Sequence, residues 1–579
     1  MDRLQAILHD LKCGRIDKAE AHRRLDAGRG RRDAVVSLFA MHWREQGPGR
    51  PFGDDRQRLL WACEQLGPVD AATPLCAGQA DAVARFETYA AQLLAALKAL
   101  PAQGPEVLVQ VAVPAAQETL FGLSGLLLTA QLENPRLRGQ VIGLERVDDM
   151  AAMLRVEGRQ ADALVRYRAG VRSVMVSEAC AAAPAGHPWR DGGVYLITGG
   201  SGGLGMLFAR DILRHVGQAT VILAGRSPQP AQPLPAPLRY RQIDVADAAA
   251  VSAGVRAIRE EFGALNGILH CAGVLRDGYL RHKSVADLRA VLAPKVRGLV
   301  NLDQASDGVG LDLFVAFSSL AGVTGNVGQA DYAAANAFMD RYAAGHARLL
   351  SINWPLWADG GMRVDAATAD VLRESMGLTP LATQDGLRAF YQAVAGGARQ
   401  VLVAAGDSRR IDALLKPPAR VAAVVGDIAT DATASPAAVL AELKVLFAAT
   451  TRFPAAQLDA FEPLSSYGID SIMITRLNQK LGAVFGALPK TLLYEYRTLA
   501  ALADYLCAHH PAACRRWRAP AGTPAPLARS AAGVSEPIAI VGISGRYPQA
   551  RTLAEYWDNL KAGRDCIAEI PDERWPLPG

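Results

Sequence analysis

A glycine-rich run between a strand pattern and a helix pattern constrains this 579-residue chain more than any other feature. Residues 194–197 form a short apolar segment typical of a buried strand, and residues 206–216 have the apolar spacing of a helix. Between them, Gly200, Gly202 and Gly205 complete a G-x-G-x-x-G pattern. Glycines at this spacing permit a tight turn and let backbone N–H groups approach a pyrophosphate at the start of the helix. The pattern predicts a dinucleotide-binding βαβ unit.

The residues that follow indicate which dinucleotide is bound. The next strand pattern, 220–224, leads into Arg226 and Ser227, where NAD-preferring sites carry an acidic residue. A guanidinium and a hydroxyl suit a 2′-phosphate, whereas a carboxylate would repel it, so the sequence favours NADPH over NADH. Asp244 and Val245 are expected beside the adenine. The residues expected to bind the cofactor are Gly200, Ser201, Gly202, Gly203, Leu204, Gly205, Arg226, Ser227, Asp244, Val245, Ala272 and Gly273.

A serine, a tyrosine and an asparagine lie further along at a spacing that suits carbonyl reduction. Ser319 precedes Tyr332 by thirteen residues, and Asn336 follows Tyr332 by four, on the same face of a helix. A ketone that accepts a hydride needs a hydrogen-bond donor at its oxygen and then a proton, and a tyrosine hydroxyl can supply both. Taken alone, the run 332–336 would not exclude an alanine-rich core helix, but its surroundings do.

An earlier part of the chain has the same βαβ pattern but lacks the glycine-rich turn. Residues 106–113 and 139–144 have strand patterns, and residues 117–132 between them have a helical pattern. The connection at 114–117, where a phosphate-cradling turn would lie, contains no glycine. We therefore expect this half to be a nucleotide-binding fold that holds no nucleotide and has a structural role.

Composition excludes several classes of protein. Half of the residues are hydrophobic and 21% are charged, which is typical of a globular chain, and the net charge is only +5. There is no Lys/Arg block for nucleic acid, no signal peptide, no apolar run of membrane-spanning length and no metal-ligand pairing among the eight cysteines and ten histidines. We expect a cytoplasmic protein with reduced cysteines, no metal, and no nucleic-acid or membrane partner.

Six motifs in order resemble the ketoreductase domain of modular (type I) polyketide synthases, a relative of the short-chain dehydrogenases/reductases. They are TGGSGGLG, GRS, HCAGVLRDG, LAPKVRG, FSSLAG and GQADYAAANAF. That family carries an N-terminal, cofactor-less copy of the fold, which matches the glycine-poor half. Most short-chain reductases have a lysine four residues after the tyrosine, where this chain has Asn336. In the resembling ketoreductases the lysine lies upstream, and Lys295 stands in that context.

The resemblance implies a role for each catalytic residue. Tyr332 would donate the proton, and Ser319 would orient the ketone. Lys295 would depress the pKa of the tyrosine and touch the ribose of the cofactor, and Asn336 would steady a proton-relay water. An intact reductase is therefore expected.

The resemblance also bears on the configuration of the alcohol. B-type members of the family, which give the D-configured alcohol, carry Leu-Asp-Asp near the nicotinamide, and this chain retains only the last aspartate, Asp277, in Leu-Arg-Asp. The tryptophan that marks A-type members is replaced by Thr324. The sequence therefore favours a B-type reductase with Asp277 in stereocontrol.

A second candidate site begins at Ser471, which falls in the first turn of an amphipathic helix pattern. Without context, Asp-Ser at this place is most often a helix N-cap. However, PLSSYGIDSI followed by a four-helix pattern resembles an acyl carrier protein. The resemblance implies that a phosphopantetheinyl transferase attaches 4′-phosphopantetheine to Ser471.

The end of the chain resembles the opening of a ketosynthase. The pattern at 536–548 and the Asp-Glu-Arg-Trp run at 572–575 carry this resemblance, and Cys566 lies too early to be the nucleophile of that family. The ketosynthase is expected to be truncated and to have no condensing activity. A ketosynthase directly after a carrier, with no acyltransferase motif in the chain, is compatible with an acyltransferase that acts in trans.

The sequence thus predicts an α/β protein with two Rossmann-like, doubly wound subdomains, of which the first has no cofactor site, followed by an all-α four-helix carrier and an incomplete thiolase-like stub. The predicted boundaries are a helical docking or capping element at 1–30, a structural subdomain at 31–188, a catalytic subdomain at 189–418, a linker at 419–435, a carrier at 436–510, a linker at 511–535 and a ketosynthase N-terminus at 536–579. The expected reaction is NADPH-dependent reduction of a β-ketoacyl chain on a carrier thioester, in concert with neighbouring polyketide synthase modules. The alternatives are a carrier and docking scaffold with a silent reductase, and a dehydrogenase that acts on free ketones.

Overall fold

The computed structural model describes residues 35–48, 57–78, 80–100, 105–134, 136–145, 150–181, 186–230, 233–361, 373, 376–415, 436–451, 458–462, 464, 471–486, 488, 492–496, 498–518, 552–562 and 564. The predicted helical element at 1–30, the linker at 419–435 and the strand pattern at 536–548 lie outside these residues.

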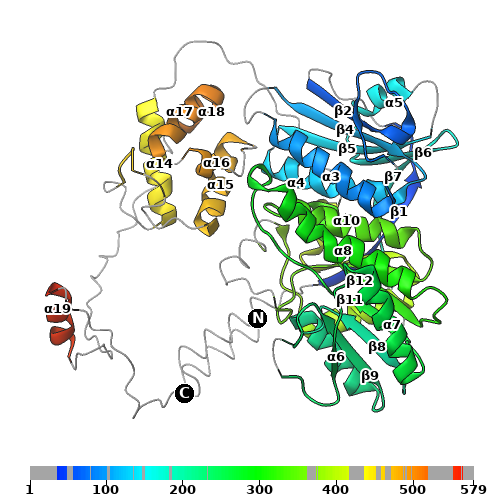
Figure 1. Cartoon of the computed structure of the whole chain (residues 1–579). Coiled ribbons are helices and arrows are strands. Elements are labelled where there is room, and N and C mark those ends of the chain that lie inside the picture. The colour runs from blue at the N-terminus through cyan, green and yellow to red at the C-terminus, as the bar shows by residue number, and fades with distance from the viewer. Residues whose placement is uncertain are drawn as a thin grey trace, which may run out of the picture. The chain divides into compact units, whose positions relative to one another are not determined.

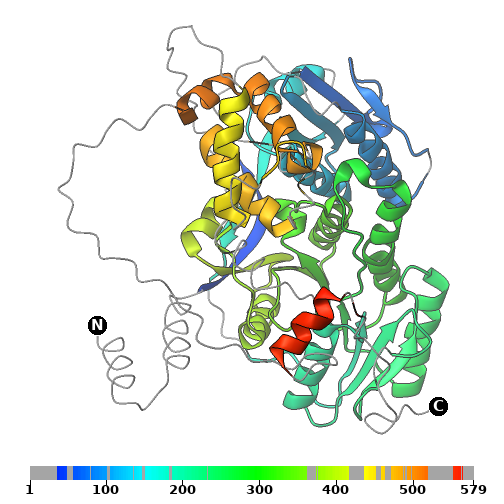
Figure 2. The ribbon, with the colours of Figure 1, turned by 90° about the vertical axis from the view of Figure 1, so that its left-hand side faces the viewer.

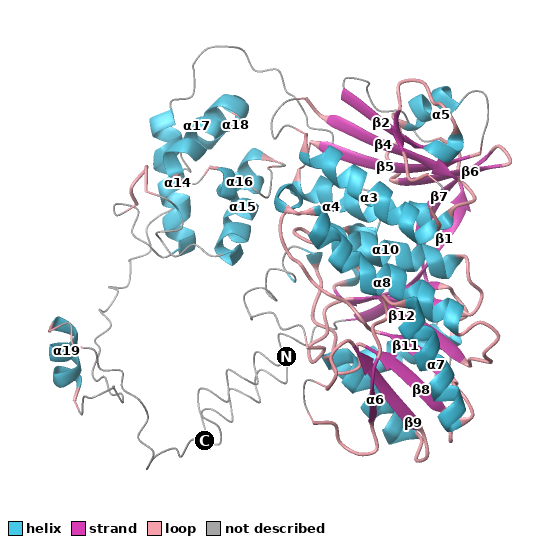
Figure 3. Cartoon of the chain, in the orientation of Figure 1, coloured by secondary structure: helices cyan, strands magenta, loops and turns pink. Residues whose placement is uncertain are grey.

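The two predicted βαβ halves share one sheet of 14 strands, which the sequence did not indicate (Figure 3). The junction is formed by β14 (Gln400–Gly406), which pairs antiparallel with β1 (Val35–Glu45). On its other side β1 pairs antiparallel with β7 (Val171–Ala179). The first strand of one half is therefore hydrogen-bonded to the last strand of the other.

The second half is a parallel, doubly wound sheet with the order β10-β9-β8-β11-β12-β13-β14. The chain leaves β8 toward β9 and β10 and then returns to the other side at β11, so the direction of winding switches between β8 and β11. In such sheets ligands bind beyond the carboxyl ends of the strands at this point. The strands of this half, apart from β14, are β8 (Val194–Thr198), β9 (Thr220–Gly225), β10 (Arg239–Gln242), β11 (Gly267–His270), β12 (Leu313–Ser319) and β13 (Leu349–Trp354).

The first half has the order β3-β2-β4-β5-β6-β7-β1. Its predicted strands are confirmed as β4 (Val107–Pro114) and β5 (Leu137–Leu144), which pair in parallel. The predicted helix between them is divided into a 3-10 turn, η2 (Glu118–Leu123), and an α-helix, α4 (Ser124–Glu133). The remaining strands are β2 (Gln57–Cys63), β3 (Thr73–Leu75) and β6 (Leu164–Arg168).

One face of the sheet is covered by helices from both halves (Figure 1). From the first half come α3 (Ala82–Lys98) and α4, and from the second come α7 (Ala248–Phe262), α8 (Val285–Ala305) and α10 (Ala330–Ala344). Their buried side chains form one apolar cluster that runs across the boundary between the halves. The opposite face of the second half is covered by α6 (Gly203–His215) and α12 (Thr383–Ala395), which pack in a second cluster.

Two glycines set the distance between α10 and the first half. A Cβ placed on Gly125 would lie 2.4 Å from the carbonyl carbon of Ala333 in α10. A Cβ on Gly122 would lie 2.8 Å from the backbone nitrogen of Phe338. Real Cβ atoms do not approach backbone atoms so closely, so the backbones of η2 and α4 meet α10 only because these two residues lack side chains.

The carrier region is helical (Figure 2). It consists of α14 (Pro436–Thr451), α15 (Ser471–Phe485), α16 (Leu492–Glu495), α17 (Leu499–His509) and α18 (Pro511–Arg518) around an apolar core. The prediction that a linker begins at residue 511 is wrong, because α18 places the fully buried Cys514 in this core. Pro511 reads as a helix breaker, but proline is favoured in the first turn of a helix, where its missing N–H costs nothing.

Residues 519–579 form a separate unit, in which the structure describes α19 (Leu553–Lys561). Within the described part of the whole chain, no helix combines the length and the apolar character needed to cross a bilayer. The six cysteines among the described residues are free thiols, as composition predicted.

The glycine contact gives a test of the fold. Because overpacking a core costs about 1–3 kcal/mol or more and here the obstacle is backbone, Gly125→Ala should lower the free energy of unfolding by about 2 kcal/mol despite its higher helix propensity. Chemical denaturation measures the change. Gly217→Ala is the control, since a Cβ there meets no atom within 4 Å. Equal stability of the two variants would contradict the proposed contact.

Candidate active site

The predicted cofactor turn lies at the carboxyl edge of the sheet, at the switch between β8 and β11. Thr198 is in register with Ala224 of β9 and with His270 of β11, so three strands end side by side. Gly199 turns the chain with φ +65°, and a Cβ on it would lie 2.8 Å from Cα of Ala272. The turn therefore sits directly against Ala272, beside the position predicted for the nicotinamide.

The geometry of this turn fits a pyrophosphate. Gly202 is the N-cap of α6, so Gly203, Leu204 and Gly205 lie in its first turn, where backbone N–H groups lack helical acceptors. A Cβ on Gly205 would lie 2.6 Å from Cα of Gly200, which shows how tightly the turn closes under the helix. Ser201 lies in this turn and is half-buried. The N–H groups and the positive end of the helix dipole therefore form a cradle for an anion.

The residues predicted for the adenosine end follow β9 and β10. Arg226 and Ser227 form an exposed loop that is held in place by two side chains of β10: Gln242 donates to the carbonyl oxygen of Arg226 at 3.0 Å, and Tyr240 donates to that of Ser227 at 2.8 Å. Among the described residues, the guanidinium of Arg226 has no hydrogen-bond or ion-pair partner. It is therefore available to a phosphate.

Asp244 and Val245 lie after β10, at the same edge. The Asp244 carboxylate accepts the N–H of Ala246 at 3.0 Å, and the Val245 side chain is buried in the core. Asn301 of α8 donates to the carbonyl oxygen of Val245 at 2.9 Å. The Asp244 carboxylate and the Val245 carbonyl oxygen thus already have partners within the chain, and the place of these residues beside an adenine stays a prediction.

The four predicted catalytic residues come together from three elements. Ser319 ends β12, Lys295 lies in α8, and Tyr332 and Asn336 lie in α10. The Lys295 Nζ donates to the carbonyl oxygen of Phe317 at 3.0 Å and lies 5.3 Å from the centre of the Tyr332 ring.

The same lysine connects these residues to the cofactor turn. A Cβ on Gly273, which follows Ala272, would lie 3.0 Å from Cε of Lys295. The predicted nicotinamide position and the catalytic residues are therefore one site.

Burial governs the protonation of this site. It lowers the pKa of the Lys295 ammonium to about 8, partly offset by Cys271 and Asp340. It raises the pKa of the Tyr332 hydroxyl above its ordinary value, while interactions with the Asn336 and Ser319 side chains lower it and Asp277 raises it. The role expected of Lys295, to depress the pKa of the tyrosine, stays a prediction; the net pKa of the hydroxyl is raised because desolvation of the phenolate outweighs the other effects. The hydroxyl remains protonated at neutral pH.

Asn336 is fully buried and only half satisfied. Its Nδ2 donates to the carbonyl oxygen of Tyr332 at 2.7 Å, while its buried Oδ1 has no partner among the described residues. A buried polar atom without a partner is uncommon and calls for a bound water or ligand. The predicted role of Asn336, to hold a proton-relay water, fits this observation.

A buried polar network that sequence reasoning missed aligns β12 with α10. Asn353 of β13 donates to the Ser319 carbonyl oxygen at 2.8 Å, to the Ser318 hydroxyl at 3.1 Å and to the Asp340 carboxylate at 2.7 Å. Ser351 donates to the other Asp340 oxygen at 2.6 Å. The network joins the strand that carries Ser319 to the helix that carries Tyr332. In the sequence, the only signal for this network is the presence of Ser351 and Asn353 in an otherwise apolar strand pattern.

Asp277, the predicted stereocontrol residue, lies in the loop after β11. Its carboxylate is exposed and accepts from Nε2 of Gln329 at 3.1 Å, just before α10 begins. Ser471, the residue predicted to carry phosphopantetheine, is the first residue of α15 in the carrier.

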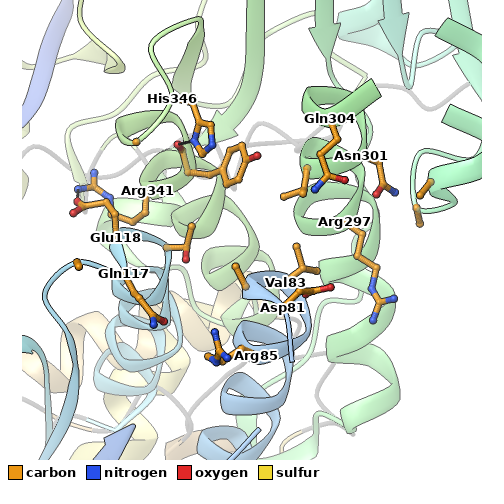
Figure 4. A pocket seen from close by; sticks show the side chains of 18 residues that line it. Asp81, Val83, Arg85, Gln117, Glu118, Arg297, Asn301, Gln304, Arg341 and His346 are labelled. Atoms are coloured by element: carbon orange, nitrogen blue, oxygen red, sulfur yellow. Dashed lines mark hydrogen bonds and ion pairs between the residues drawn. The ribbon is translucent and has the colours of Figure 1, made fainter. Parts of the chain in front are cut away.

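A separate cavity of about 730 Å³ lies between the first half and the far end of α10 (Figure 4). Arg85 and Gln117 of the first half line it, and Arg341 lies beside Glu118, across the cavity from Arg297. Arg297 is paired with Glu87, and Arg341 contacts Glu118. None of the predicted catalytic or cofactor residues lines this cavity, so it is not the predicted site.

Comparison with known families matches three parts of the chain. Residues 193–359 match the KR domain model, residues 441–506 match the phosphopantetheine attachment site, and residues 535–578 match the N-terminal domain of β-ketoacyl synthase. All the predicted catalytic and cofactor residues lie within the first match, and Ser471 lies within the second.

Individual proteins agree with these matches. The chain is 38% identical over 566 residues to polyketide synthase PksL of Bacillus subtilis (strain 168), and 32% identical over 720 residues to polyketide synthase ThaG of Burkholderia thailandensis, in each case across 85% of this chain. It spans only 12% and 13% of the lengths of these two relatives. A crystal structure of a ketoreductase domain from the bacillaene assembly line superposes with a TM-score of 0.60 at 32% identity, covering 66% of this chain and 99% of that domain.

Removal of the charge from each of two buried lysines near the site should change the free energy of unfolding in opposite directions. Among the described residues Lys295 makes no ion pair with a carboxylate, so Lys295→Met should raise the free energy of unfolding at pH 7 by about 1–3 kcal/mol, because a pKa lowered from 10.5 to about 8 means that folding disfavours the ammonium. The gain should shrink as the pH rises from about 8 to above 10, where the unfolded lysine also loses its proton.

Lys283→Met is the matched control. Its Nζ lies 2.8 Å from the buried Asp331 carboxylate, so its removal leaves an unpaired buried charge and should cost about 3–5 kcal/mol at pH 7. Chemical denaturation at pH 7 and pH 10 measures both. Destabilisation by both substitutions at pH 7 would refute the assignment of Lys295 as an uncompensated buried charge.

Proposed function

Because this chain belongs to the type I polyketide synthases, with a ketoreductase domain, a phosphopantetheine carrier and part of a ketosynthase N-terminal domain, we propose that it uses NADPH to reduce a carrier-bound β-ketoacyl thioester to the β-hydroxyacyl thioester. The observation that carries the proposal is the convergence of Ser319, Lys295 and Tyr332 beside the glycine turn.

Each of these residues has a defined task in the proposed reaction. NADPH, when bound, supplies the hydride. The hydroxyls of Ser319 and Tyr332 hydrogen-bond to the ketone oxygen and so stabilise the negative charge that develops there. Tyr332 then gives up its proton to this oxygen; its hydroxyl is protonated at neutral pH and so holds a proton to give.

Lys295 and Asn336 support the tyrosine once it has lost its proton. The Lys295 ammonium lies against the Tyr332 ring and favours the phenolate electrostatically. The free Oδ1 of Asn336 can hold the water that returns a proton to the tyrosine. Burial of both side chains keeps bulk water away from this exchange.

The preference for NADPH is supported by the loop after β9. Arg226 is exposed beyond the carboxyl end of this strand with no partner among the described residues, and two side chains of β10 fix its backbone. A guanidinium held in place but unpaired suits a 2′-phosphate.

The proposed product has the D configuration of B-type ketoreductases. Asp277 supports this assignment, because its negative charge acts on the Tyr332 hydroxyl and its carboxylate accepts a hydrogen bond from Gln329, just before α10. Thr324, at the place of the A-type tryptophan, lies in the short helix α9 (Ala321–Thr324), where its hydroxyl donates to the Leu320 carbonyl oxygen.

The carrier is proposed to hold the growing chain on 4′-phosphopantetheine attached to Ser471. A serine that begins a helix presents its phosphodiester to the positive end of the helix dipole. The proposed partners are a phosphopantetheinyl transferase, neighbouring modules of the assembly line and an acyltransferase that acts in trans.

The cofactor preference can be tested by substitution of Arg226. Arg226→Ala should raise the KM for NADPH by about 10- to 100-fold, the value of one charge-assisted contact, and change the KM for NADH by less than twofold. Arg239→Ala is the control, because this exposed arginine of β10 is paired with Glu261. Steady-state kinetics with both cofactors measure the effect. An equal loss with NADPH and NADH would refute a role in 2′-phosphate recognition.

The reaction itself can be tested on the pantetheinylated protein. With a β-ketoacyl group loaded on Ser471 and NADPH added, the acyl chain should gain the mass of two hydrogens and yield the D-configured alcohol by chiral chromatography. Tyr332→Phe should slow this step by about 100- to 10,000-fold, the usual worth of a positioned general acid. Unchanged turnover by Tyr332→Phe would favour the silent-reductase alternative.

Ser471→Ala separates the carrier from the reductase. This variant should not be loaded, yet it should still reduce a β-ketoacyl pantetheine thioester supplied in solution. Loading of the alanine variant would refute the attachment site. Equal rates on the thioester and on the corresponding free ketone would favour a dehydrogenase of free ketones.

A further inference from the structure

One carboxylate of the first half contacts two backbone segments of the second half that lie beside the candidate active site. Glu133, the last residue of α4, is buried and accepts two backbone N–H groups from segments far away in sequence. Its Oε2 accepts from Leu280 at 2.7 Å, and its Oε1 accepts from Gly328 at 2.9 Å. Leu280 belongs to the loop that carries Asp277, and Gly328 lies just before Tyr332. A single side chain therefore joins the two segments that border the catalytic tyrosine.

Further hydrogen bonds join the loop at 276–283 to the start of α10, and one closes the loop on itself. The N–H of Gly278 donates to the Gly328 carbonyl oxygen at 2.9 Å. Lys283 donates to the carbonyl oxygen of Arg276 at 2.6 Å and to the Asp331 carboxylate at 2.8 Å. Together with Glu133, these contacts hold the loop at 276–283 against the start of α10.

The position of Glu133 is unfavourable for the helix that carries it. A carboxylate in the last turn of a helix faces the negative end of the helix dipole, and burial raises its pKa above the ordinary value. The two backbone N–H groups offset this cost, and each would be buried without a partner if the carboxylate were absent. The hydrogen bonds of the Glu133 side chain thus stabilise the position of the loop, not the helix α4.

We propose that Glu133 is a positioning residue for ketone reduction: it sets the distance between the loop at 276–283 and the start of α10, and so determines which face of the ketone is presented to the hydride. This proposal rests on the proposed reductase function. It assigns the first half a direct part in product configuration, beyond support of the fold. The close contacts of Gly122 and Gly125 with α10 hold α4 in place independently, so loss of the Glu133 contacts should release the loop and leave the helix docked.

The test uses Glu133→Gln in the full chain. An amide oxygen can accept one of the two N–H groups, but the amide nitrogen faces the other as a second donor. We expect at least tenfold faster amide hydrogen exchange in peptides that cover 278–283 and 326–330, a D-to-L alcohol ratio at least fivefold lower, and a KM for the β-ketoacyl thioester that rises more than kcat falls.

Glu157→Gln is the matched control. Glu157 is a fully buried carboxylate of the first half, paired with Arg172 at 2.6 Å, and it touches neither segment. The Glu157→Gln substitution should lower the midpoint of thermal unfolding at least as much as Glu133→Gln does. It should change neither the D-to-L alcohol ratio nor amide hydrogen exchange at 278–283. If both variants behave alike in these readouts, Glu133 is only structural and the proposal is overturned.

The design separates this proposal from the proposed function. If the wild-type protein reduces no thioester, the reductase assignment fails, while hydrogen exchange still shows whether Glu133 holds the loop. If the wild type is active and Glu133→Gln accelerates exchange without changing the alcohol ratio, the contact is real but has no part in configuration, and the proposal fails alone.

Discussion

The position of the catalytic tyrosine depends on a backbone-to-backbone contact between the two halves of the sheet. Gly122 and Gly125 let η2 and α4 approach α10 more closely than any side chain would allow. On its sheet-facing side, α10 is fixed by the Asp340 and Asn353 network. Because no side chain separates the backbones at the two glycines, a shift of the first half would move α10 and with it Tyr332. The first half has no nucleotide turn, but its fold is thus required to position Tyr332.

The electrostatics of the site follow from burial rather than from strong ion pairs. Burial raises the pKa of the Tyr332 hydroxyl and lowers the pKa of the Lys295 ammonium to about 8. The site therefore holds a proton donor beside a cation that forms no ion pair with any carboxylate of the described residues. Such an arrangement suits transfer of a proton to a developing alkoxide, and it is unfavourable for folding.

The sequence predicted the parts of the site that depend on local patterns. The glycine turn between β8 and α6, and the strands on either side of α4, follow from short-range spacing, and the structure bears them out. The pairing of β1 with β14 could not be predicted, because register between strands more than 350 residues apart leaves no local signal. Glu133 was missed because a glutamate at a helix end resembles a solvated charge, and α18 because Pro511 resembles a linker. The net rise in the pKa of the Tyr332 hydroxyl could not be predicted, because the degree of burial is not visible in spacing.

The antiparallel pairing of β1 with β14 has a consequence for anyone who recombines these domains. The catalytic half starts at about residue 189 in the sequence, but a cut there would remove β1 and expose the edge of β14, a fully buried strand. Unpaired apolar edges invite association with other chains. The smallest unit that keeps every strand paired therefore runs from β1 to β14, and an exchange of reductases between assembly lines should carry both halves together.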